Sequence, residues 1–247
     1  MNRKIFYPCC AVLYLALFSI AALGQDQSTN PDSDPRARDM LRDARNSRYC
    51  VSNFSGLTAE FVLNDNGKTA KGSIDYEVGK SVDLKIEGVD EEVKGWLAEM
   101  VLNIIQHIRG GDFSKGDGRY PITFAGDDNS PAGRRIAVSN QMKSYYRVRD
   151  NQVVEVERTM GADHFIIDVL EMTRMPEGKE LPRHFTVTYF DKSGALSRTD
   201  TFTDEYKQVE GRWFPVSRRM FRAENGRVIT RVIAFQNPRI RFAQQLQ

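Results

Sequence analysis

The segment "EYKQVEGRWFPVSRRMFRAENGRVITRVIAF", residues 205–235, decides the fold class of this chain. Apolar and polar side chains alternate along most of it, and a period of two is typical of β-strands. Gly211 and the pair Asn225-Gly226 interrupt the alternation, and both are typical of tight turns between antiparallel strands. The segment therefore predicts parts of three strands joined by two hairpins.

The same period of two recurs over most of the chain. Asn66-Gly67 predicts a further tight hairpin, and the polar side chains that alternate around it predict a meander with one solvent-facing side. The segments with this pattern are residues 57–63, 74–78, 82–86, 136–138, 146–148, 154–156, 165–169, 185–190 and 196–209.

Two segments carry a helical period instead. Asp34 followed by Pro35 is typical of a helix start, and it predicts a short amphipathic helix to about Arg48. Acidic residues after Asp90 open a longer helix that ends at Gly110-Gly111. The prediction is a mainly β (α+β) fold: a long curved antiparallel sheet, or half-barrel, of roughly a dozen strands. One N-terminal helix and one inserted amphipathic helix pack on this sheet.

The first 24 residues have the pattern of a secretory signal peptide. Arg3 and Lys4 precede an apolar run, residues 9–23, that is shorter than the roughly 20 residues of a membrane-spanning helix. We expect cleavage after Gly24 and no transmembrane span afterwards; retention as an anchor is the alternative. The expected organisation is a signal peptide (1–24), a polar disordered tether (25–34) and a single β domain (35–247). The expected location is the periplasm or the extracellular space.

Charge excludes one class of partner. Lys plus Arg falls from 35 to 33 when Arg3 and Lys4 are removed, against 33 Asp plus Glu, so the mature chain is formally neutral. A nucleic-acid-binding domain normally has an excess of Lys and Arg. We therefore expect no nucleic-acid partner.

The sequence contains no recognisable motif for catalysis or metal binding. His107, His164 and His184 lack the close spacing of zinc ligands, no serine lies in a GxSxG motif, and Cys50 has no neighbouring histidine. We expect no metal, no cofactor and no enzymatic activity. Convergence of His164, His184 and a carboxylate in one pocket would instead indicate an enzyme.

The last strands are rich in arginine. If the arginine stems cover the outer face of the sheet, their charged ends stay in water. Alternatively, Arg218 and Arg219 lie beside an apolar cavity and contact acidic head groups, or they contact a partner protein. The arginines of this region are Arg212, Arg218, Arg219, Arg222, Arg227, Arg231, Arg239 and Arg241.

The order of signal peptide, helix, meander with an inserted helix, and a "YKQVEGRWFP" hairpin is similar to the lipoprotein-carrier superfamily of LolA, LolB and RseB. The residues that carry this resemblance are Tyr206, Val209, Gly211, Trp213 and Pro215. More closely, "ARDMLRDARNSRY", "FSGLTAEFVL", "GVDEEVKGWL", "YRVRDNQVVEVER" and "DTFTDEYKQVEGRWFPVSRRM" resemble a family recorded only as a domain of unknown function. The resemblance implies a curved half-barrel whose concave face is closed by helices, often around an apolar cavity for acyl chains.

The function that these features favour is non-enzymatic binding. The protein is expected to hold a lipid or other hydrophobic ligand in a helix-covered half-barrel. The alternative is an envelope protein-interaction or sensor module with a filled core and an arginine-rich sheet surface. The residues expected to line the cavity are Phe61, Trp96, Met100, Ile104, Phe214 and Met220.

Overall fold

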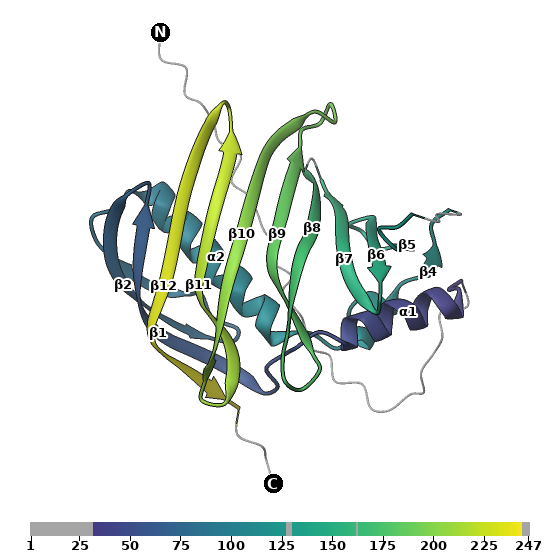
Figure 1. Cartoon of the computed structure of the whole chain (residues 1–247), viewed down its shortest axis with the longest axis horizontal. Coiled ribbons are helices and arrows are strands. Elements are labelled where there is room, and N and C mark those ends of the chain that lie inside the picture. The colour runs from purple at the N-terminus through teal and green to yellow at the C-terminus, as the bar shows by residue number, and fades with distance from the viewer. Residues whose placement is uncertain (1–31, 127–129, 162, 244–247) are drawn as a thin grey trace.

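In this computed structural model, the described residues, 32–126, 130–161 and 163–243, form one antiparallel sheet of twelve strands and two α-helices. The sheet and its two helices confirm the predicted fold class (Figure 1). The helices are α1 (Pro35–Asn46) and α2 (Glu91–Arg109). The strands are β1 (Phe54–Asp65), β2 (Lys68–Glu77), β3 (Asp83–Ile86), β4 (Ile122–Phe124), β5 (Arg134–Val138), β6 (Ser144–Arg149), β7 (Gln152–Met160), β8 (Asp163–Arg174), β9 (Glu180–Phe190), β10 (Leu196–Val209), β11 (Arg212–Glu224) and β12 (Arg227–Phe242).

The first and the last strand of the sequence pair with each other inside the sheet. Its strand order is β3-β2-β1-β12-β11-β10-β9-β8-β7-β6-β5-β4, so neighbours in the sheet are neighbours in sequence except where β1 meets β12. There Phe61 lies opposite Phe235. Because β3 and β4 are the two edges, α2 and the short 3-10 turns Phe113–Lys115 and Asp117–Arg119 carry the chain from one edge to the other.

Residues with positive φ form the turns that the sequence predicted. Asn66 (φ 49°) and Gly67 (φ 88°) join β1 to β2, and Asn225 (φ 50°) and Gly226 (φ 71°) join β11 to β12. A two-residue hairpin turn of type I′ requires positive φ at both central residues, and its backbone twist matches that of the two strands it joins. Gly211 (φ 74°) lies in the turn between β10 and β11. All three predicted turns are confirmed.

Helix α2 has the predicted boundaries and the predicted buried face. The Asp90 side chain accepts a hydrogen bond from the Val93 N–H at 2.8 Å, and Gly110 (φ 65°) follows the last helical residue. The apolar face packs against β1, β2 and β9 to β12 in the larger of two cores. Its buried residues are Val93, Leu97, Met100, Val101, Ile104, Ile105 and Ile108.

Helix α1 begins at the predicted N-cap and covers the other part of the sheet. The Asp34 carboxylate accepts hydrogen bonds from the N–H groups of Arg36 at 2.8 Å and Ala37 at 3.3 Å. The helix ends at Asn46 rather than near Arg48. It packs into a second, smaller core whose buried residues are Ala37, Leu41, Ala44, Ile122, Ile136, Val138, Tyr146 and Val148.

Both helices lie on the same face of the sheet. Side chains directly opposite one another on paired strands share a face. Tyr146 lies opposite Val156, Val156 opposite Ile167, and Ile167 opposite Val187, and this row joins the smaller core to the larger one. The covered face therefore carries two cores, with a seam between them over β7, β8 and β9.

The expected signal peptide, residues 1–24, lies outside the described residues, as do residues 25–31 of the expected tether. The end of that tether contacts the folded chain. Ser33 Oγ accepts a hydrogen bond from the Ile122 N–H at 3.0 Å, and the Asp34 N–H donates to the Ile122 carbonyl at 2.8 Å. Among the described helices, neither is long and apolar enough to cross a membrane.

Candidate functional site

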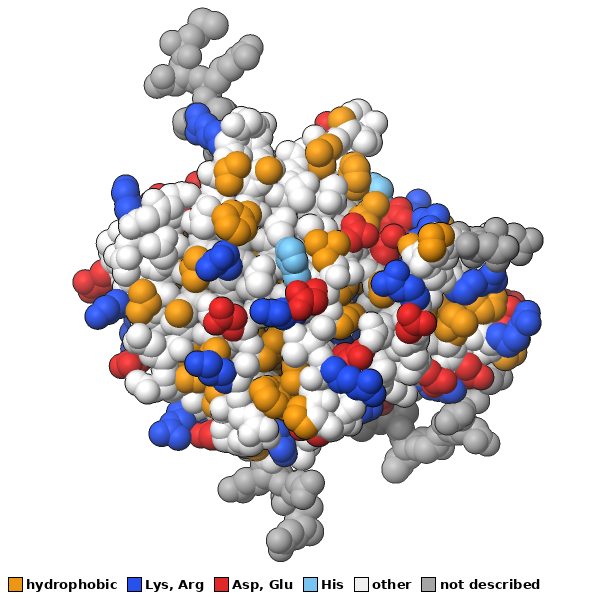
Figure 2. Space-filling model, viewed as in Figure 1, with side chains coloured by type: hydrophobic (Ala, Val, Ile, Leu, Met, Phe, Trp, Pro, Cys, Tyr) orange, Lys and Arg blue, Asp and Glu red, His pale blue; other side chains and the backbone are white. Residues whose placement is uncertain are grey.

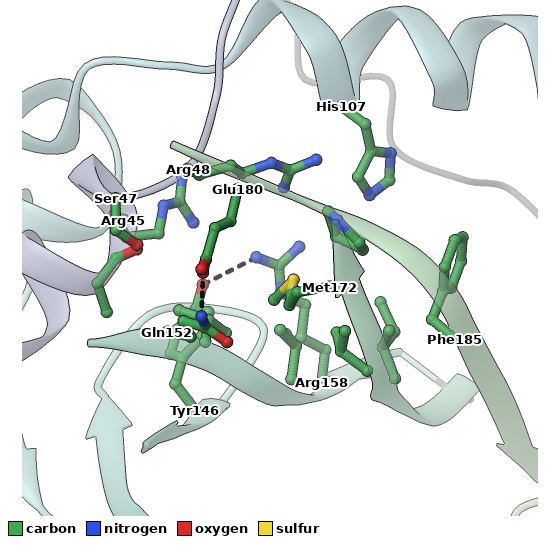
Figure 3. A pocket seen from close by; sticks show the side chains of 16 residues that line it. Arg45, Ser47, Arg48, His107, Tyr146, Gln152, Arg158, Met172, Glu180 and Phe185 are labelled. Atoms are coloured by element: carbon green, nitrogen blue, oxygen red, sulfur yellow. Dashed lines mark hydrogen bonds between the residues drawn. The ribbon is translucent and has the colours of Figure 1, made fainter. Parts of the chain in front are cut away.

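A cavity of about 170 Å³ lies at the seam between the two helices. The end of α1 and the residues after it form one wall, α2 contributes His107, and β6 to β9 form the rest, as the labelled side chains in Figure 3 show. Its floor is formed by inward-facing side chains of β7, β8 and β9 that neither helix covers. Most of these side chains are apolar. The apolar lining residues are Ala44, Val153, Val156, Ile167, Val169, Met172, Pro182 and Phe185.

The segment that follows α1, residues 47–51, crosses the seam and is called the strap below. The Glu180 N–H donates a hydrogen bond to the Ser47 carbonyl at 3.1 Å, and the Tyr49 N–H donates to the Glu180 carbonyl at 2.9 Å. These bonds place Arg48 beside Glu180 in a parallel bridge. The backbone of Arg48 is therefore held at the edge of the cavity.

The strap is also bonded to the larger core. The Val51 N–H donates to the carbonyl of Ile108, in the last turn of α2, at 2.7 Å. The Tyr49 hydroxyl accepts a hydrogen bond from the backbone N–H of Trp213, on β11, at 3.0 Å. The strap is therefore bonded to β9, α2 and β11 together.

One polar wall of the cavity is a bonded cluster around Asp117. Its carboxylate accepts hydrogen bonds from Arg45 Nη1 and from the Tyr146 hydroxyl, both at 3.0 Å. Arg158 Nη2 in turn donates to the Tyr146 oxygen at 2.9 Å. Burial, with a further contribution from Asp117, raises the pKa of Tyr146. The hydroxyl therefore stays protonated and links the two arginines to one carboxylate.

Arg48 has no such partner. Its side chain forms no hydrogen bond and no ion pair with any residue that the structure describes, and its Nε is buried. Burial lowers the pKa of Arg48, but a guanidinium stays charged at physiological pH. Glu180, the carboxylate on the same wall, instead accepts a hydrogen bond from Gln152 (Figure 3). Among the arginines of the cavity, Arg48 is thus the one whose side chain has no hydrogen-bond or ion-pair partner among the described residues.

His107 closes the α2 side of the cavity as a neutral group. Its Nδ1 lies 2.7 Å from the carbonyl oxygen of Asn103, to which it donates. Burial, together with the nearby cations Arg48 and Arg218, lowers the pKa of His107 to about 3. The imidazole is therefore uncharged at neutral pH and adds no second positive charge to the cavity.

A buried ion pair lies beside the cavity, on the same face of the sheet. Arg218 and Asp204 bond through two contacts of 2.6 Å, and the guanidinium carbon of Arg218 lies 5.4 Å from the centre of the Phe185 ring. Arg218 Nη1 also donates to the side chain of Asn103 at 3.0 Å. Since Asn103 belongs to α2, this bond connects the helix to the sheet next to the cavity.

One protein-family model matches nearly all of the described chain. The model of one family, described as a protein of unknown function, DUF3386, matches residues 32–240. The chain belongs to the DUF3386 family. No curated protein matches the sequence of this DUF3386 protein.

Several solved structures align with the DUF3386 protein at low identity. A LolA superfamily protein of Nitrosomonas europaea aligns over 84% of this chain and 94% of its own, with 10% identity and a TM-score of 0.39. A candidate outer membrane lipoprotein-sorting protein domain of Vibrio parahaemolyticus aligns over 85% and 94%, with 9% identity and a TM-score of 0.33. A DUF1329 family protein of Desulfovibrio piger aligns over 83% and 92%, with 11% identity and a TM-score of 0.31. The LolA superfamily, which the sequence resembles, is thus among these matches.

The cavity residues expected from sequence gather elsewhere in this DUF3386 protein. They lie in the larger core under α2, where Phe61 and Ile104 are 1% exposed and Phe214 and Met220 are fully buried. Met100 is 8% exposed, and Trp96 packs against the same core. None of the six lines the cavity at the seam. Contact of these side chains with a ligand stays a prediction.

Arg218 and Arg219 point to opposite faces. Arg218 is buried in its ion pair with Asp204, and Arg219 is exposed on the face without helices. Figure 2 views the molecule from that helix-free side, where hydrophobic side chains are scattered among charged ones. Other arginines of the last strands are also paired: Arg222 with Asp200, Arg231 with Asp65, Arg239 with Glu210 and Arg241 with Asp75.

The histidines do not converge. His164 lies opposite Phe190 on β9 and bonds to Glu157 at 3.0 Å, whereas His184 lies six residues from Phe190 on the same strand. Six residues of strand span about 20 Å. Within the described part of the chain, no group of three or more potential ligands is arranged to hold a metal ion.

Arg48 and Arg158 are cavity residues that sequence reasoning missed. Arg48 follows the end of α1 and carries no periodic signal, because its position depends on the hydrogen bonds between the strap and β9. Arg158 does carry a signal: it is two residues from Val156 on β7 and therefore shares its inward face. An inward-facing arginine flanking an apolar strand position is a mark of a buried polar site.

Proposed function

We propose that this protein is an exported, non-enzymatic binding protein that holds a hydrophobic ligand at the seam between α1 and α2. The observation that carries the proposal is the apolar floor of the cavity, formed by Val156, Ile167, Val169 and Phe185. On either side of the cavity, buried apolar side chains of α1 and α2 pack against the sheet in the two cores. An apolar cavity left in an otherwise packed core costs stability and favours an apolar ligand.

The volume of the cavity supports a ligand with a small apolar part. At about 170 Å³ it resembles the engineered cavity of about 150 Å³ that binds benzene. It is smaller than the roughly 300–1,000 Å³ of sites for drug-sized ligands. We therefore expect a ring or a short length of acyl chain to lie inside, with any longer chain leaving through the opening.

Binding is proposed in preference to catalysis because of how the titratable groups are arranged. His107 donates to a backbone carbonyl and is uncharged at neutral pH. Arg45 and Tyr146 both donate to Asp117, and Arg158 donates to the Tyr146 oxygen. No side chain of this group is placed as a nucleophile with an adjacent base. Export follows from the expected signal peptide, and the compartment proposed is the periplasm or extracellular space.

The proposal is tested by asking whether the protein carries or binds an apolar molecule. Native mass spectrometry of the purified protein reports a bound ligand and its stoichiometry together, and a titration with a fluorescent fatty acid reports binding by the empty fraction. We expect a co-purifying apolar ligand, or saturable binding that an unlabelled fatty acid displaces. Absence of both would end the proposal and favour the protein-interaction alternative.

A further inference from the structure

The charges that line the cavity are unevenly paired. Arg45 is bonded to Asp117, Arg158 to Tyr146, and Glu180 to Gln152. Arg48 has neither a hydrogen bond nor an ion pair among the described residues, although its Nε is buried. Buried charges are normally paired and hydrogen-bonded, because an unpaired one keeps the full cost of its lost hydration. The unmatched Arg48 is therefore the feature of the cavity that a ligand can satisfy.

The backbone of Arg48 is held in place before any ligand arrives. The residues on either side, Ser47 and Tyr49, are hydrogen-bonded to Glu180 on β9, and the strap continues to Ile108 of α2. The guanidinium thus extends from a backbone held at both ends, next to an apolar floor (Figure 3). Because this backbone is already ordered, only the side chain of Arg48 loses conformational freedom when it binds an anion.

From this arrangement we propose that the ligand is an amphipathic monoanion, whose carboxylate binds Arg48 while its apolar body lies on Val156, Ile167 and Val169. The inference rests on the proposed function and names the chemical class of its ligand. A carboxylate matches the fork of N–H donors on a guanidinium. A single negative charge fits better than two, because Glu180 lies on the same wall and His107 is uncharged at neutral pH.

The test compares two probes that share an eight-carbon chain, octanoate and 1-octanol, and differ in charge. Their dissociation constants are measured by calorimetry on the whole protein at neutral pH. We expect octanoate to bind at least about tenfold more tightly than 1-octanol, which is the usual gain from a charge-assisted hydrogen bond. Arg48→Met is expected to remove this advantage by weakening octanoate about tenfold while leaving 1-octanol nearly unchanged.

Two further variants make the result specific. Arg42→Met removes a cation from the exposed side of α1, where Arg42 pairs with Asp39 and Asp43, and should change neither affinity. Arg48→Lys keeps the charge but loses the two-pronged geometry, and should give an intermediate affinity for octanoate. This variant also serves if Arg48→Met does not fold.

The outcomes separate the two proposals. If 1-octanol binds but octanoate binds no better, or if the Arg48 variants weaken both probes equally, the carboxylate site is overturned and the hydrophobic cavity stands. If neither probe binds the wild-type protein, the carboxylate site and the binding function both fail.

Discussion

Arg218 and Asp204 face each other directly on β11 and β10 and form a two-pronged ion pair, with both nitrogen–oxygen distances at 2.6 Å. Their side chains are 3% and 1% exposed. The pair also bonds to Asn103 of α2, so it connects the helix to the sheet beside the cavity. Its neighbour Arg219 lies on the opposite face in water.

This contrast gives the first prediction. Arg218→Met leaves the Asp204 carboxylate buried without a partner, and we expect a loss of about 3–5 kcal/mol in the free energy of unfolding. Arg219→Met is the matched control, with an expected change within about 0.5 kcal/mol. Urea unfolding followed by circular dichroism measures both. Similar losses in the two variants would show that the ion pair between Arg218 and Asp204 does not provide this stability.

The second prediction concerns the strap. Tyr49→Phe removes the acceptor of the Trp213 N–H and leaves that donor without its bond. The expected cost is about 1–3 kcal/mol in the free energy of unfolding. Tyr76→Phe is the control, because Tyr76 is similarly buried and no hydrogen bond of its hydroxyl to a described residue is found. Equal stabilities of the two variants in urea would contradict the role of the strap bond.

The third prediction is a dependence of stability on pH. His107 is neutral in the folded protein because its pKa is lowered to about 3, whereas in the unfolded chain it titrates near the usual value of about 6.5. Between these values the unfolded state binds more protons, so stability falls as the pH falls from about 6.5 toward 3. Acidification from pH 7 to pH 5 should cost up to about 2 kcal/mol through this group.

The variant His107→Gln isolates that effect, since an amide can still donate to the Asn103 carbonyl without titrating. We expect the variant to lose less stability than the wild type between pH 7 and pH 5, as measured by urea unfolding at each pH. Parallel losses in the two proteins would mean that His107 is not held neutral in the folded state.

The fourth prediction fills the cavity. Ile167 lines the floor, and Ile166 points to the other face of β8 because side chains alternate along a strand. Ile167→Trp should occupy part of the cavity volume and weaken fatty-acid binding at least about tenfold, at a cost of about 1–3 kcal/mol in stability. Ile166→Trp should leave binding unchanged. If the two variants bind a fluorescent fatty acid equally well, the ligand does not lie on Ile167.

Much of the fold could be predicted from local sequence. The turns at Asn66-Gly67 and Asn225-Gly226 are set by residues that tolerate positive φ, and the start of α2 is set by the Asp90 cap. The alternation of side chains along β11 likewise places Arg218 and Arg219 on opposite faces. Each of these features depends on residues within a few positions of one another, so the sequence by itself determines them.

The tertiary structure alone decided which faces are covered and where space remains. The pairing of β1 with β12 joins the first strand in the sequence to the last one, and Ser47 and Tyr49 of the strap bond to β9, which begins at Glu180. The cavity is formed by α1, α2 and the strands β6 to β9, and the two helices lie far from each other in sequence. No periodic pattern in the sequence indicates the gap between them. Whether an arginine such as Arg48 has a counter-charge depends on distances in space, because ion pairing follows proximity in the folded chain and not spacing along it.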